Sequence, residues 1–523
     1  MRKIIIIGAG VSGLCAGIYA QKAGYNTIIY EKNSNSGGSC SGWYRNGYAI
    51  DNCLHWLAGT ADGTEQNKLW KEVGAIDDNS KIIHRNAFYS SEYDGITVTL
   101  WRDLEKTRSE LLALSSDDAD EINGFLDCVI FVNDVLNSGM TPKDIIKAFN
   151  DSDFSSSHLS FARHFLRYLG LNMADWADKF RHPAIKALIM DFTAKEYESY
   201  WLILSYSFFA FGNGDIIEGG SISLSRKLTD SYINAGGTLR LNAPVDRIII
   251  SKQHYAFKPV ETAVNENKNL RRMVTRQAEG IVLANGVKDY ADYIICTCDI
   301  NYTFNHLLKK RYTPKSLEAI YENKKNCMVY SSFQVAFFVD SLFKEVDDTL
   351  GFECNPFEVA FQTYHRIVVK NYRCYGDYIA PEGHTVIQCS FPQYDKDFRF
   401  WKKLYQNKAL YNNTKRNIAN LICNRIEERF PQYEGRIHLL DVWTPYSYAR
   451  RNNDYKGAYM RFLTTPFNQN SFLSSEIKGL TNVFLAGHWL KYPGGVPTAS
   501  TTGKNVIQQI IEKDSETKDR TGS

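Results

Sequence analysis

Three glycines and one glutamate near the N-terminus have the types and the spacing that can hold a phosphate-bearing ligand. Gly8, Gly10 and Gly13 stand in the sequence GAGVSGL, and Glu31 ends the next apolar run. The first glycine permits a tight turn, the second lets the backbone approach a pyrophosphate, and the third lets a helix pack closely on a sheet. The glutamate is placed to accept hydrogen bonds from a ribose. The pattern predicts a dinucleotide-binding site.

The segments around these residues are those that such a site needs. Residues 4–7 are continuously apolar and β-branched, which is typical of a strand buried on both faces. A helix is expected over about residues 13–23, ending at Gly24, and a second strand over residues 25–30. The N-terminus of that helix would direct unpaired N–H groups at the phosphates. Because these elements occur in the required order, we favour a ligand site over an empty glycine turn.

His55, in the sequence DNCLHWL, is the candidate for a catalytic residue that transfers a proton. It follows the glycine segment closely, and imidazole is the side chain that ordinarily titrates nearest neutral pH. The alternative, which is the commoner situation for a single histidine, is a buried histidine with a structural role. The sequence has neither the HExxH spacing of a metal site nor the GxSxG turn of a nucleophilic serine, so no metal is expected.

The bulk composition indicates a globular chain. Its 523 residues are 44% hydrophobic and 23% charged, and the net charge of +3 is too small to indicate a nucleic acid partner. Eleven cysteines without a spaced framework favour a reduced, cytoplasmic protein. No apolar run reaches the roughly twenty residues of a membrane span. The nearest, residues 200–212, is expected in the core; lining an apolar pocket and peripheral membrane contact are the alternatives, and the oligomeric state stays open.

The order of expected elements predicts an α/β fold in which a Rossmann-type domain is assembled from three chain segments and carries an inserted α+β substrate domain. Glycine-terminated helices and buried strands mark the nucleotide segments, whereas helical and aromatic stretches mark the insertions. The boundaries are residues 1–63, 212–300 and 456–512 for the nucleotide domain, residues 64–211 (mostly helical) and 301–455 for the substrate domain, and residues 513–523 for a disordered tail.

Four sequence blocks resemble the group of flavin-dependent enzymes that contains phytoene desaturases, carotenoid isomerases and retinol saturases, distant relatives of the amine oxidases. The blocks are GAGVSGL with Glu31 and Gly37-Gly38; NGYAIDNCLHWL; GGS…GG…LNAPVDRI; and FLAGHWLKYPGGVPTAS. A weaker fifth block, TPYSYARRNNDYKGAYM, covers residues 444–460. The order and spacing run over nearly the whole chain, but the insertions match only in outline.

The resemblance implies that the dinucleotide is FAD. The implied cofactor-binding residues are Gly8, Gly10, Gly13, Glu31, Lys32, Gly38, Ser39, Val245, Gly487, His488, Gly495, Val496, Pro497 and Thr498. Two positions depart from the family pattern: His488 stands where an acidic or small residue is usual, and Ser39 where many desaturases have an arginine. Tyr446, Tyr448 and Arg450 are candidates for lining the substrate cavity; a packed aromatic edge with a surface arginine is the equal alternative.

The resemblance also implies an FAD-dependent oxidoreductase that desaturates, saturates or isomerises carbon–carbon double bonds of a lipophilic polyene or unsaturated lipid by hydride exchange with flavin N5. The sequence carries one dinucleotide fingerprint, so electrons would come from the substrate, transient NAD(P)H, a quinone, oxygen or a partner protein. The alternatives are an amine or amino-acid oxidase on the same fold, a flavin- or lipid-binding protein with little turnover, and a nicotinamide-dependent dehydrogenase. Fold analogy does not choose among them.

Overall fold

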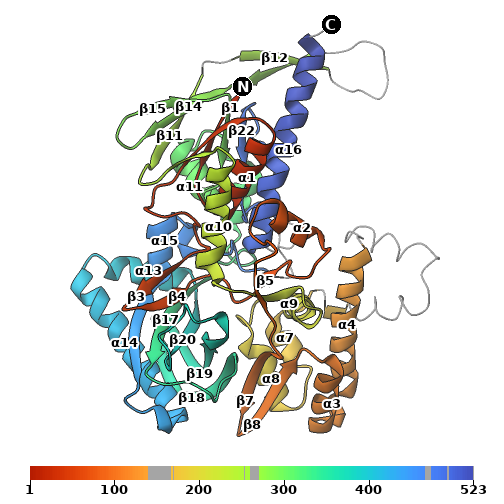
Figure 1. Ribbon diagram of the computed structural model, residues 1–523, viewed down its shortest axis with the longest axis vertical. Coiled ribbons are helices and arrows are strands. Elements are labelled where there is room, and N and C mark those ends of the chain that lie inside the picture. The colour runs from red at the N-terminus through yellow and green to blue at the C-terminus, as the bar shows by residue number, and fades with distance from the viewer. Residues whose placement is uncertain are drawn as a thin grey trace, which may run out of the picture.

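The computed structural model describes residues 1–138, 167–168, 170–251, 254–259, 270–465, 473–491 and 494–521. Figure 1 shows an upper part with a parallel sheet and a lower part built around a large mixed sheet. The chain crosses between the two parts more than once, so each contains segments that are distant in sequence. The predicted fold class, a Rossmann-type α/β domain carrying an α+β insertion, is confirmed.

A five-stranded parallel sheet is the frame of the upper part. Its order is β10-β2-β1-β16-β22, so strands from three separated parts of the chain lie side by side. The central strand is β1, in which Ile4, Ile5 and Ile6 are fully buried, as a β-branched strand covered on both faces must be. The bounds are β1 Lys3–Ile7, β2 Asn26–Tyr30, β10 Thr238–Arg240, β16 Tyr293–Cys296 and β22 Val483–Leu485.

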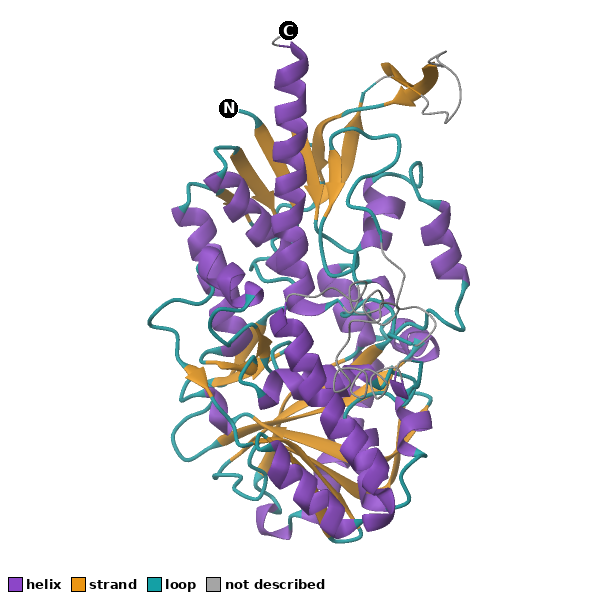
Figure 2. Ribbon diagram, turned by 90° about the vertical axis from the view of Figure 1, so that its right-hand side faces the viewer, coloured by secondary structure: helices purple, strands orange, loops and turns teal. Residues whose placement is uncertain are grey.

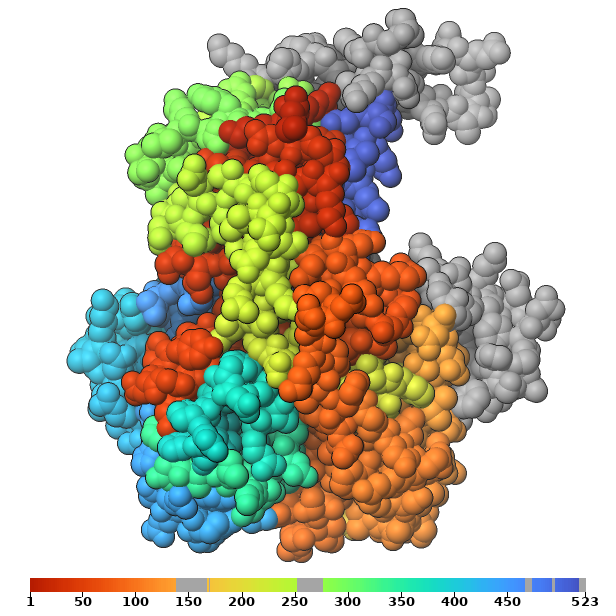
Figure 3. Space-filling model, in the orientation of Figure 1, coloured from red at the N-terminus to blue at the C-terminus, as the bar shows by residue number. Residues whose placement is uncertain are grey.

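Three helices pack around this sheet. Helix α1 (Val11–Lys22) contacts both α10 (Gly220–Asn234) and α16 (Gly495–Thr521). Figure 2 shows α16 standing in front of the parallel strands, and Figure 3 shows the surface of the α10 region running down the face that joins the two parts. The close approach of α16 to α1 requires Gly503, because a Cβ there would lie 2.6 Å from the carbonyl oxygen of Ser12.

The expectation that residues 513–523 form a disordered tail is wrong, because α16 continues to Thr521. Asp514 on this helix is buried, accepts a hydrogen bond of 2.7 Å from the hydroxyl of Tyr25, and pairs with Arg2. These contacts attach the helix to the N-terminal strands. The polar composition of residues 513–523 predicts disorder, because composition alone does not reveal that Asp514 contacts residues near the N-terminus.

The large sheet of the lower part joins the two insertions. Its order is β21-β17-β20-β19-β18-β7-β8, and every neighbouring pair is antiparallel except β18 with β7. Strands β7 and β8 come from the first insertion and the other five from the second, so one sheet unites both. The bounds are β7 Ala87–Tyr93, β8 Ile96–Trp101, β17 Ser331–Val339, β18 Thr349–Val359, β19 Gln362–Asn371, β20 Thr385–Gln393 and β21 Ile437–Trp443.

Helices from each insertion pack on their own strands of this sheet. In the second insertion α14 packs on β18 and β21, with α13 and α15 beside it, and in the first α3, α8 and α9 pack on β7 and β8. Helix α8 begins at Pro183, and the side chain of His182 accepts the hydrogen bond that caps it. The bounds are α3 Leu104–Leu114, α4 Ala119–Ser138, α7 Met173–Ala177, α8 Pro183–Asp191, α9 Tyr200–Ala210, α13 Asp395–Leu404, α14 Lys408–Arg429 and α15 Pro445–Asn452.

Smaller sheets and helices complete the fold. Strand β9 pairs with β5 and β6, and β11 pairs with β14, which continues through the turn at Asn285-Gly286 into β15. The remaining bounds are β3 Gly42–Arg45, β4 Tyr48–Asp51, β5 Leu57–Ala58, β6 Ile82–Ile83, β9 Gly214–Ile217, β11 Val245–Ile250, β12 His254–Pro259, β13 Leu270–Thr275, β14 Ala278–Leu283, β15 Lys288–Tyr290, α2 Glu65–Glu72, α11 Ile300–Tyr302 and α12 Lys315–Glu322.

Helix α9 contains most of the apolar run expected in the core. Leu202, Ile203 and Tyr206 are fully buried, which confirms that expectation, while Trp201 and Phe208 also line an internal cavity. Its apolar surface is therefore used inside the protein. Among the helices that the structure describes, none is both long enough and apolar enough to cross a bilayer.

A buried ion pair joins the helical insertion to the large sheet and provides a test of this architecture. Arg366 on β19 donates to Asp191, at the end of α8, through Nε and Nη2, both at 2.6 Å. Asp191→Ala should lower the free energy of unfolding by about 3 kcal/mol or more, because it leaves a largely buried guanidinium without its carboxylate. The measurement is the urea denaturation midpoint of the purified protein.

The matched control is Asp117→Ala, which removes an exposed carboxylate paired with the equally exposed Arg181. That change should cost less than about 1 kcal/mol. Equal effects of the two substitutions would contradict a stabilising role for the pair between β19 and α8.

Candidate functional site

One cavity of about 1050 Å³ extends from the parallel sheet to the large sheet. At its first end it is lined by Gly8, Glu31, Thr297 and Gly487, which follow the carboxyl ends of β1, β2, β16 and β22. At the other end it is lined by residues of β19 and β20. The carboxyl edge of an open parallel sheet is where α/β proteins bind nucleotides, so the cavity joins such an edge to the inserted domain.

The N-terminus of α1 forms the phosphate end of this cavity. Its N-cap is Gly10, so no side chain accepts a hydrogen bond from the first N–H groups of the helix. A Cβ placed on Gly10 would meet nothing nearer than Gly38 Cα, at 4.0 Å, which leaves an open cradle above the turn. Free N–H groups, the positive end of the helix dipole and the open cradle together fit a pyrophosphate.

Glu31 is held rigidly beside this cradle. Its Oε2 accepts from the backbone N–H of Ala9 at 2.9 Å, and its Oε1 accepts from the backbone N–H of Asn33 at 2.8 Å. The next residue, Lys32, donates from Nζ to Asn453 Oδ1 at 2.7 Å, and burial lowers the pKa of its ammonium. The carboxylate is thus fixed at the end of β2 on the cavity wall, where a ribose hydroxyl could donate to a remaining lone pair.

The C-terminal block supplies the opposite wall. Gly487 has φ of 140°, a conformation that favours glycine, and its N–H donates to Thr502 Oγ1 at 2.9 Å. The Nε2 atom of His488 is buried and has no hydrogen-bond partner within the described part of the chain. Burial, with a contribution from Arg461, lowers the pKa of His488 to about 4, so the ring is neutral. An unpaired buried nitrogen on a cavity wall fits a group that would complete its hydrogen bonding.

The implied cofactor residues converge from three chain segments. All of them except Gly13 line the cavity, including Lys32, Ser39, Val245 and the first turn of α16 from Gly495 to Thr498. Gly13 faces the sheet instead, where a Cβ would collide with the carbonyl oxygen of Gly8 and lie 2.9 Å from Thr297 Oγ1. Its role is to let α1 approach β1. Contact of the lining residues with FAD remains a prediction.

His55 also lines the cavity, but its surroundings disfavour proton transfer. The residue is accessible from the cavity, and protein atoms surround its imidazole on the other sides. This burial, together with Lys370 and Arg85, lowers the pKa of His55 to about 3. The hydroxyl of Tyr375 donates to the backbone oxygen of His55 at 2.8 Å and holds the segment in place. A ring this weakly basic is neutral at physiological pH and suits hydrogen bonding better than general base catalysis.

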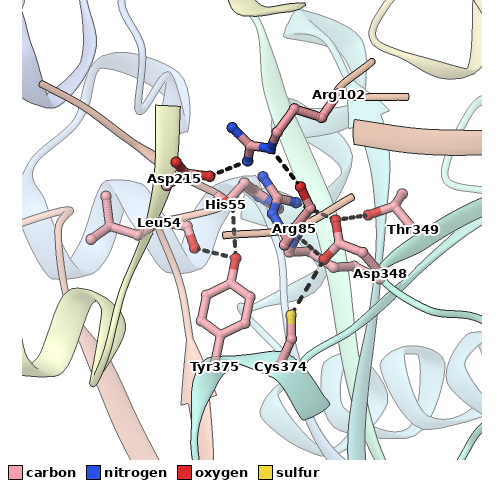
Figure 4. A network of polar contacts seen from close by, with 10 residues as sticks. Leu54, His55, Arg85, Arg102, Asp215, Asp348, Thr349, Cys374 and Tyr375 are labelled. Atoms are coloured by element: carbon pink, nitrogen blue, oxygen red, sulfur yellow. Dashed lines mark hydrogen bonds and ion pairs between the residues drawn. The ribbon is translucent and has the colours of Figure 1, made fainter. Parts of the chain in front are cut away.

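A buried charge cluster, Arg85, Asp348 and Lys370, stands beside His55. Figure 4 shows Arg85 between the Arg102–Asp215 pair and Asp348. Arg85 forms an ion pair with Asp348, and Lys370 Nζ lies 3.1 Å from the same carboxylate; the three side chains are 6%, 5% and 8% exposed. Burial opposes the charge on Asp348, but Arg85 and Lys370 outweigh it and lower its pKa. Two cations therefore share one anion on this wall.

Sequence reasoning missed this cluster because its members are distant in the chain and match no motif. One signal was present: in the segment RIVVK, residues 366–370, the cations Arg366 and Lys370 flank three apolar residues at a spacing of four, so both share one face of a strand. Arg366, Val368 and Lys370 line the cavity. An inward-facing charge in an apolar strand is expected only where a partner or a ligand meets it.

The inserted part of the cavity is also rich in aromatic side chains, with polar residues such as Thr193, Gln362 and Ser390 between them. Side chains from the helical insertion meet those from the large sheet across it, which places the chamber between the two insertions. Its aromatic lining includes Phe88, Trp201, Phe208, Tyr330, Tyr364 and Phe391. Such a surface accommodates an elongated apolar ligand.

Tyr446, Tyr448 and Arg450 are not among the described residues that line the cavity. Tyr448 is buried, and its hydroxyl accepts a hydrogen bond from the indole of Trp443 at 2.8 Å. Arg450 lies over the ring of Tyr405, 4.4 Å from its centroid. The structure therefore places the three residues in a packed aromatic edge behind the wall, because α15 turns its inner face towards β17 and β21.

Comparison with known proteins agrees with this geometry. The sequence profile of the family described as "Flavin containing amine oxidoreductase" matches residues 11–511. The chain is 22% identical to a 4,4'-diapophytoene desaturase (4,4'-diapolycopene-forming) of Methylomonas sp, over 98% of this chain and 96% of that protein. It is 23% identical to a 4,4'-diapolycopen-4-al dehydrogenase of Metabacillus indicus, over 99% of both. A crystal structure of an oxidoreductase from Methanosarcina mazei shares the fold, with a TM-score of 0.58, 15% identity, and coverage of 97% of this chain and 100% of that one.

Gly10 and Gly13 should separate cofactor binding from folding. Gly10→Ala can be accommodated by the flavin-free protein, but its methyl group fills the cradle. The Kd for flavin should therefore rise about tenfold or more, while the free energy of unfolding of the flavin-free protein changes by less than about 1 kcal/mol. Gly13→Ala should instead destabilise the flavin-free protein, because its Cβ meets backbone. The measurements are flavin bound per chain and the melting temperature after flavin removal. Unchanged flavin affinity in Gly10→Ala would contradict the cradle.

The neutral state of His55 gives a pH prediction. Because its folded pKa of about 3 lies below the ordinary value, the ring stays unprotonated in the folded protein from about pH 5 to 8. Its NMR signals, assigned by comparison with His55→Gln, should not shift over that range. A titration with a midpoint near the ordinary value would show that solvent reaches the ring and would restore the proton-transfer role.

Proposed function

The chain belongs to the Flavin containing amine oxidoreductase family, and we propose that it is an FAD-dependent oxidoreductase acting on carbon–carbon bonds of a lipophilic polyene or unsaturated lipid. The observation that carries this proposal is the single cavity that joins a dinucleotide cradle to an aromatic chamber. The two relatives reported above, which match nearly the whole chain, are by name a 4,4'-diapophytoene desaturase and a 4,4'-diapolycopen-4-al dehydrogenase. Desaturation, saturation and isomerisation are the reactions open to such a site.

The residues at the parallel sheet would hold the ADP half of FAD. The N–H groups at the start of α1 would bind the pyrophosphate, with Gly10 and Gly38 giving room for it. Glu31 would accept from the adenosine ribose, and Val245 would lie at the adenine, since both line the same end of the cavity. Ser39, already bonded by Asn452 at 3.0 Å, would lie towards the ribityl chain.

The C-terminal block would hold the flavin ring. When bound, FAD supplies hydride transfer at N5. Val496, Pro497 and Thr498 belong to the first turn of α16, whose N–H groups and positive dipole end favour negative charge on the ring. His488 would meet the cofactor as a neutral donor, because burial suppresses its protonation. This neutral imidazole replaces the acidic or small residue usual in the family.

The aromatic chamber would exclude water and orient the substrate. Phe88, Trp201 and Phe208 come from the first insertion, whereas Tyr364 and Phe391 come from the second. A substrate between them would be enclosed by both insertions and positioned by shape against the cofactor end of the cavity. Exclusion of water protects a reduced flavin and an activated carbon chain from side reactions.

An amine or amino-acid oxidase is the weaker alternative. Arg85 and Lys370 already share the carboxylate of Asp348, so this cluster leaves no unshared anion for the ammonium group of an amine substrate. A binding protein with little turnover differs from the proposed enzyme in behaviour rather than in fold, so a redox experiment distinguishes them. A nicotinamide-dependent dehydrogenase is disfavoured by the family assignment and by the C-terminal wall of the cavity.

The test is the visible spectrum of the purified protein, followed without oxygen. We expect a flavin spectrum that is bleached by NAD(P)H and restored by an unsaturated lipid if the enzyme saturates, or bleached by the lipid itself if it desaturates. An isomerase would leave the spectrum of the reduced enzyme unchanged while chromatography shows a new double-bond geometry.

Three outcomes would contradict the proposal. A colourless protein that cannot be reconstituted with FAD would exclude the flavoenzyme. Bleaching by amines but by no lipid would favour the oxidase alternative. A flavin spectrum that no donor changes, with no altered lipid, would favour the binding protein.

A further inference from the structure

Three buried hydrogen-bond donors of residues that line the cavity have no acceptor within the part of the chain that the structure describes. Arg85 has a 6% exposed side chain, yet its Nε and Nη2 have no hydrogen-bond partner among the described residues. The Nε2 of Gln388, a residue that is 5% exposed, is unpartnered as well. Both residues line the cavity. Buried donors without acceptors are rare in folded proteins and point to a ligand that supplies them.

The strand register places a second cation beside these donors. Lys370 on β19 stands directly opposite Gln388 on β20, so the two side chains lie on the same face of the sheet. Arg85, from the segment before β7, reaches the cluster through its ion pair with Asp348. The backbone oxygen of Arg85 accepts from Arg102 Nε at 2.7 Å, and its guanidinium lies over the ring of Phe209, 5.2 Å from the centroid. The donors are therefore held in place by contacts outside the cavity.

The cluster contains two basic side chains and one acidic one. Burial, with a contribution from Arg85, lowers the pKa of Lys370, so its charged form is costly without a second anion. Arg85 and Lys370 share the single carboxylate of Asp348. Burial raises the pKa of the Cys374 thiol to about 11, and His55 is neutral, so neither neighbour adds a negative charge.

The other charged groups close to Arg85 do not change this balance. The tyrosines at 372 and 375 have raised pKa values through burial, and Arg102 is paired with Asp215. An excess charge in a largely buried site is costly unless a ligand completes it.

The other cation on this face of β19 behaves differently. Arg366, four residues before Lys370, is matched by one carboxylate, Asp191, through two hydrogen bonds. The charge of Arg366 is therefore balanced by Asp191 alone. Val368 lies between the two on the same face and separates them. The wall thus presents one cation with its own carboxylate and, beyond a valine, a second cation that shares one.

We propose that Arg85, Lys370 and Gln388 form a subsite for a carboxylate at one end of an apolar, unsaturated substrate chain, a proposal that rests on the proposed function because it assumes a lipophilic substrate in this cavity. The guanidinium would donate from Nε and Nη2 to the carboxylate oxygens, which is its favoured two-point geometry, and the amide of Gln388 would donate to the same group. The negative charge of the ligand would balance the cluster. The chain would then extend along Val368 into the aromatic chamber.

The test compares acids with alcohols of the same chain on the oxidised holoenzyme. The probes are all-trans-retinoic acid with all-trans-retinol, and linoleic acid with linoleyl alcohol, and binding is measured by equilibrium dialysis. We expect the wild type to bind at least one acid about tenfold or more tightly than its alcohol, as a charge-assisted hydrogen bond to a buried cation implies. Preference within the retinoid pair would indicate a polyene acid, and preference within the linoleyl pair a fatty acid.

Two variants locate the preference at the subsite. Lys370→Met and Arg85→Met each leave Asp348 with one remaining cation, so both retain a balanced ion pair and are expected to fold. Each should weaken binding of the preferred acid about tenfold and change binding of the alcohol by less than about twofold. The control is Lys415→Met, a lysine outside the cavity lining whose Nζ donates to the backbone oxygen of Val442 at 2.8 Å; it should leave both ligands unaffected.

Equal affinity of the wild type for acid and alcohol in both pairs would overturn the proposal, and so would variants that weaken both ligands equally. Failure of the subsite is distinguishable from failure of the proposed function. If the enzyme turns over an uncharged polyene and shows no preference for acids, the subsite is contradicted but the oxidoreductase is supported. If acids are strongly preferred and the variants lose this preference, while no lipid or nicotinamide changes the flavin spectrum, the subsite is supported but the proposed reaction is contradicted.

Discussion

The site depends on one constraint, the close approach of α1 to the strands of the parallel sheet. Gly13 allows it, because any side chain there would collide with the carbonyl oxygen of Gly8. The same turn leaves the first N–H groups of α1 without a capping side chain, since Gly10 occupies the N-cap. An uncapped helix end is normally a cost, and it becomes an anion site when the neighbouring backbone leaves room for phosphates. The packing that builds the sheet therefore also builds the cradle.

The parallel sheet also determines where the rest of the chain must go. Its strands are drawn from three distant segments, and before each insertion the chain leaves the sheet at its carboxyl edge, after β2 and after β16. The insertions then meet each other in one sheet through the pairing of β7 with β18. A cavity enclosed by the two insertions and opening onto the cradle follows from this connectivity. Cofactor and substrate regions become one space because both belong to the same edge.

The sequence allowed local features to be predicted better than distant ones. The glycine turn, β1, α1 and Glu31 lie within one short segment whose spacing expresses its geometry directly. Arg85 and Lys370 could not be predicted as neighbours, because they meet only after β7 pairs with β18 and β18 pairs with β19. Tyr448 is a candidate for the cavity from its place in the weaker block at residues 444–460, yet α15 turns it into the core, where its hydroxyl accepts a hydrogen bond from Trp443. A motif indicates an element but does not specify which face of that element meets a ligand.

The charge cluster offers a way for an apolar chamber to select which bond of a substrate reacts. A polyene or lipid chain offers many similar carbons, and an aromatic wall contacts all of them with similar energy, so shape alone permits a chain to slide. A fixed cation at one wall changes this, because a carboxylate displaced from Arg85 and Lys370 would lose its partners and leave a buried charge uncompensated. The penalty for sliding is then electrostatic and steep, while the chamber still accepts the chain without specific contacts. Selectivity for one bond would thus arise far from the carbon that reacts, through the distance between a charged wall and the flavin end of the same cavity.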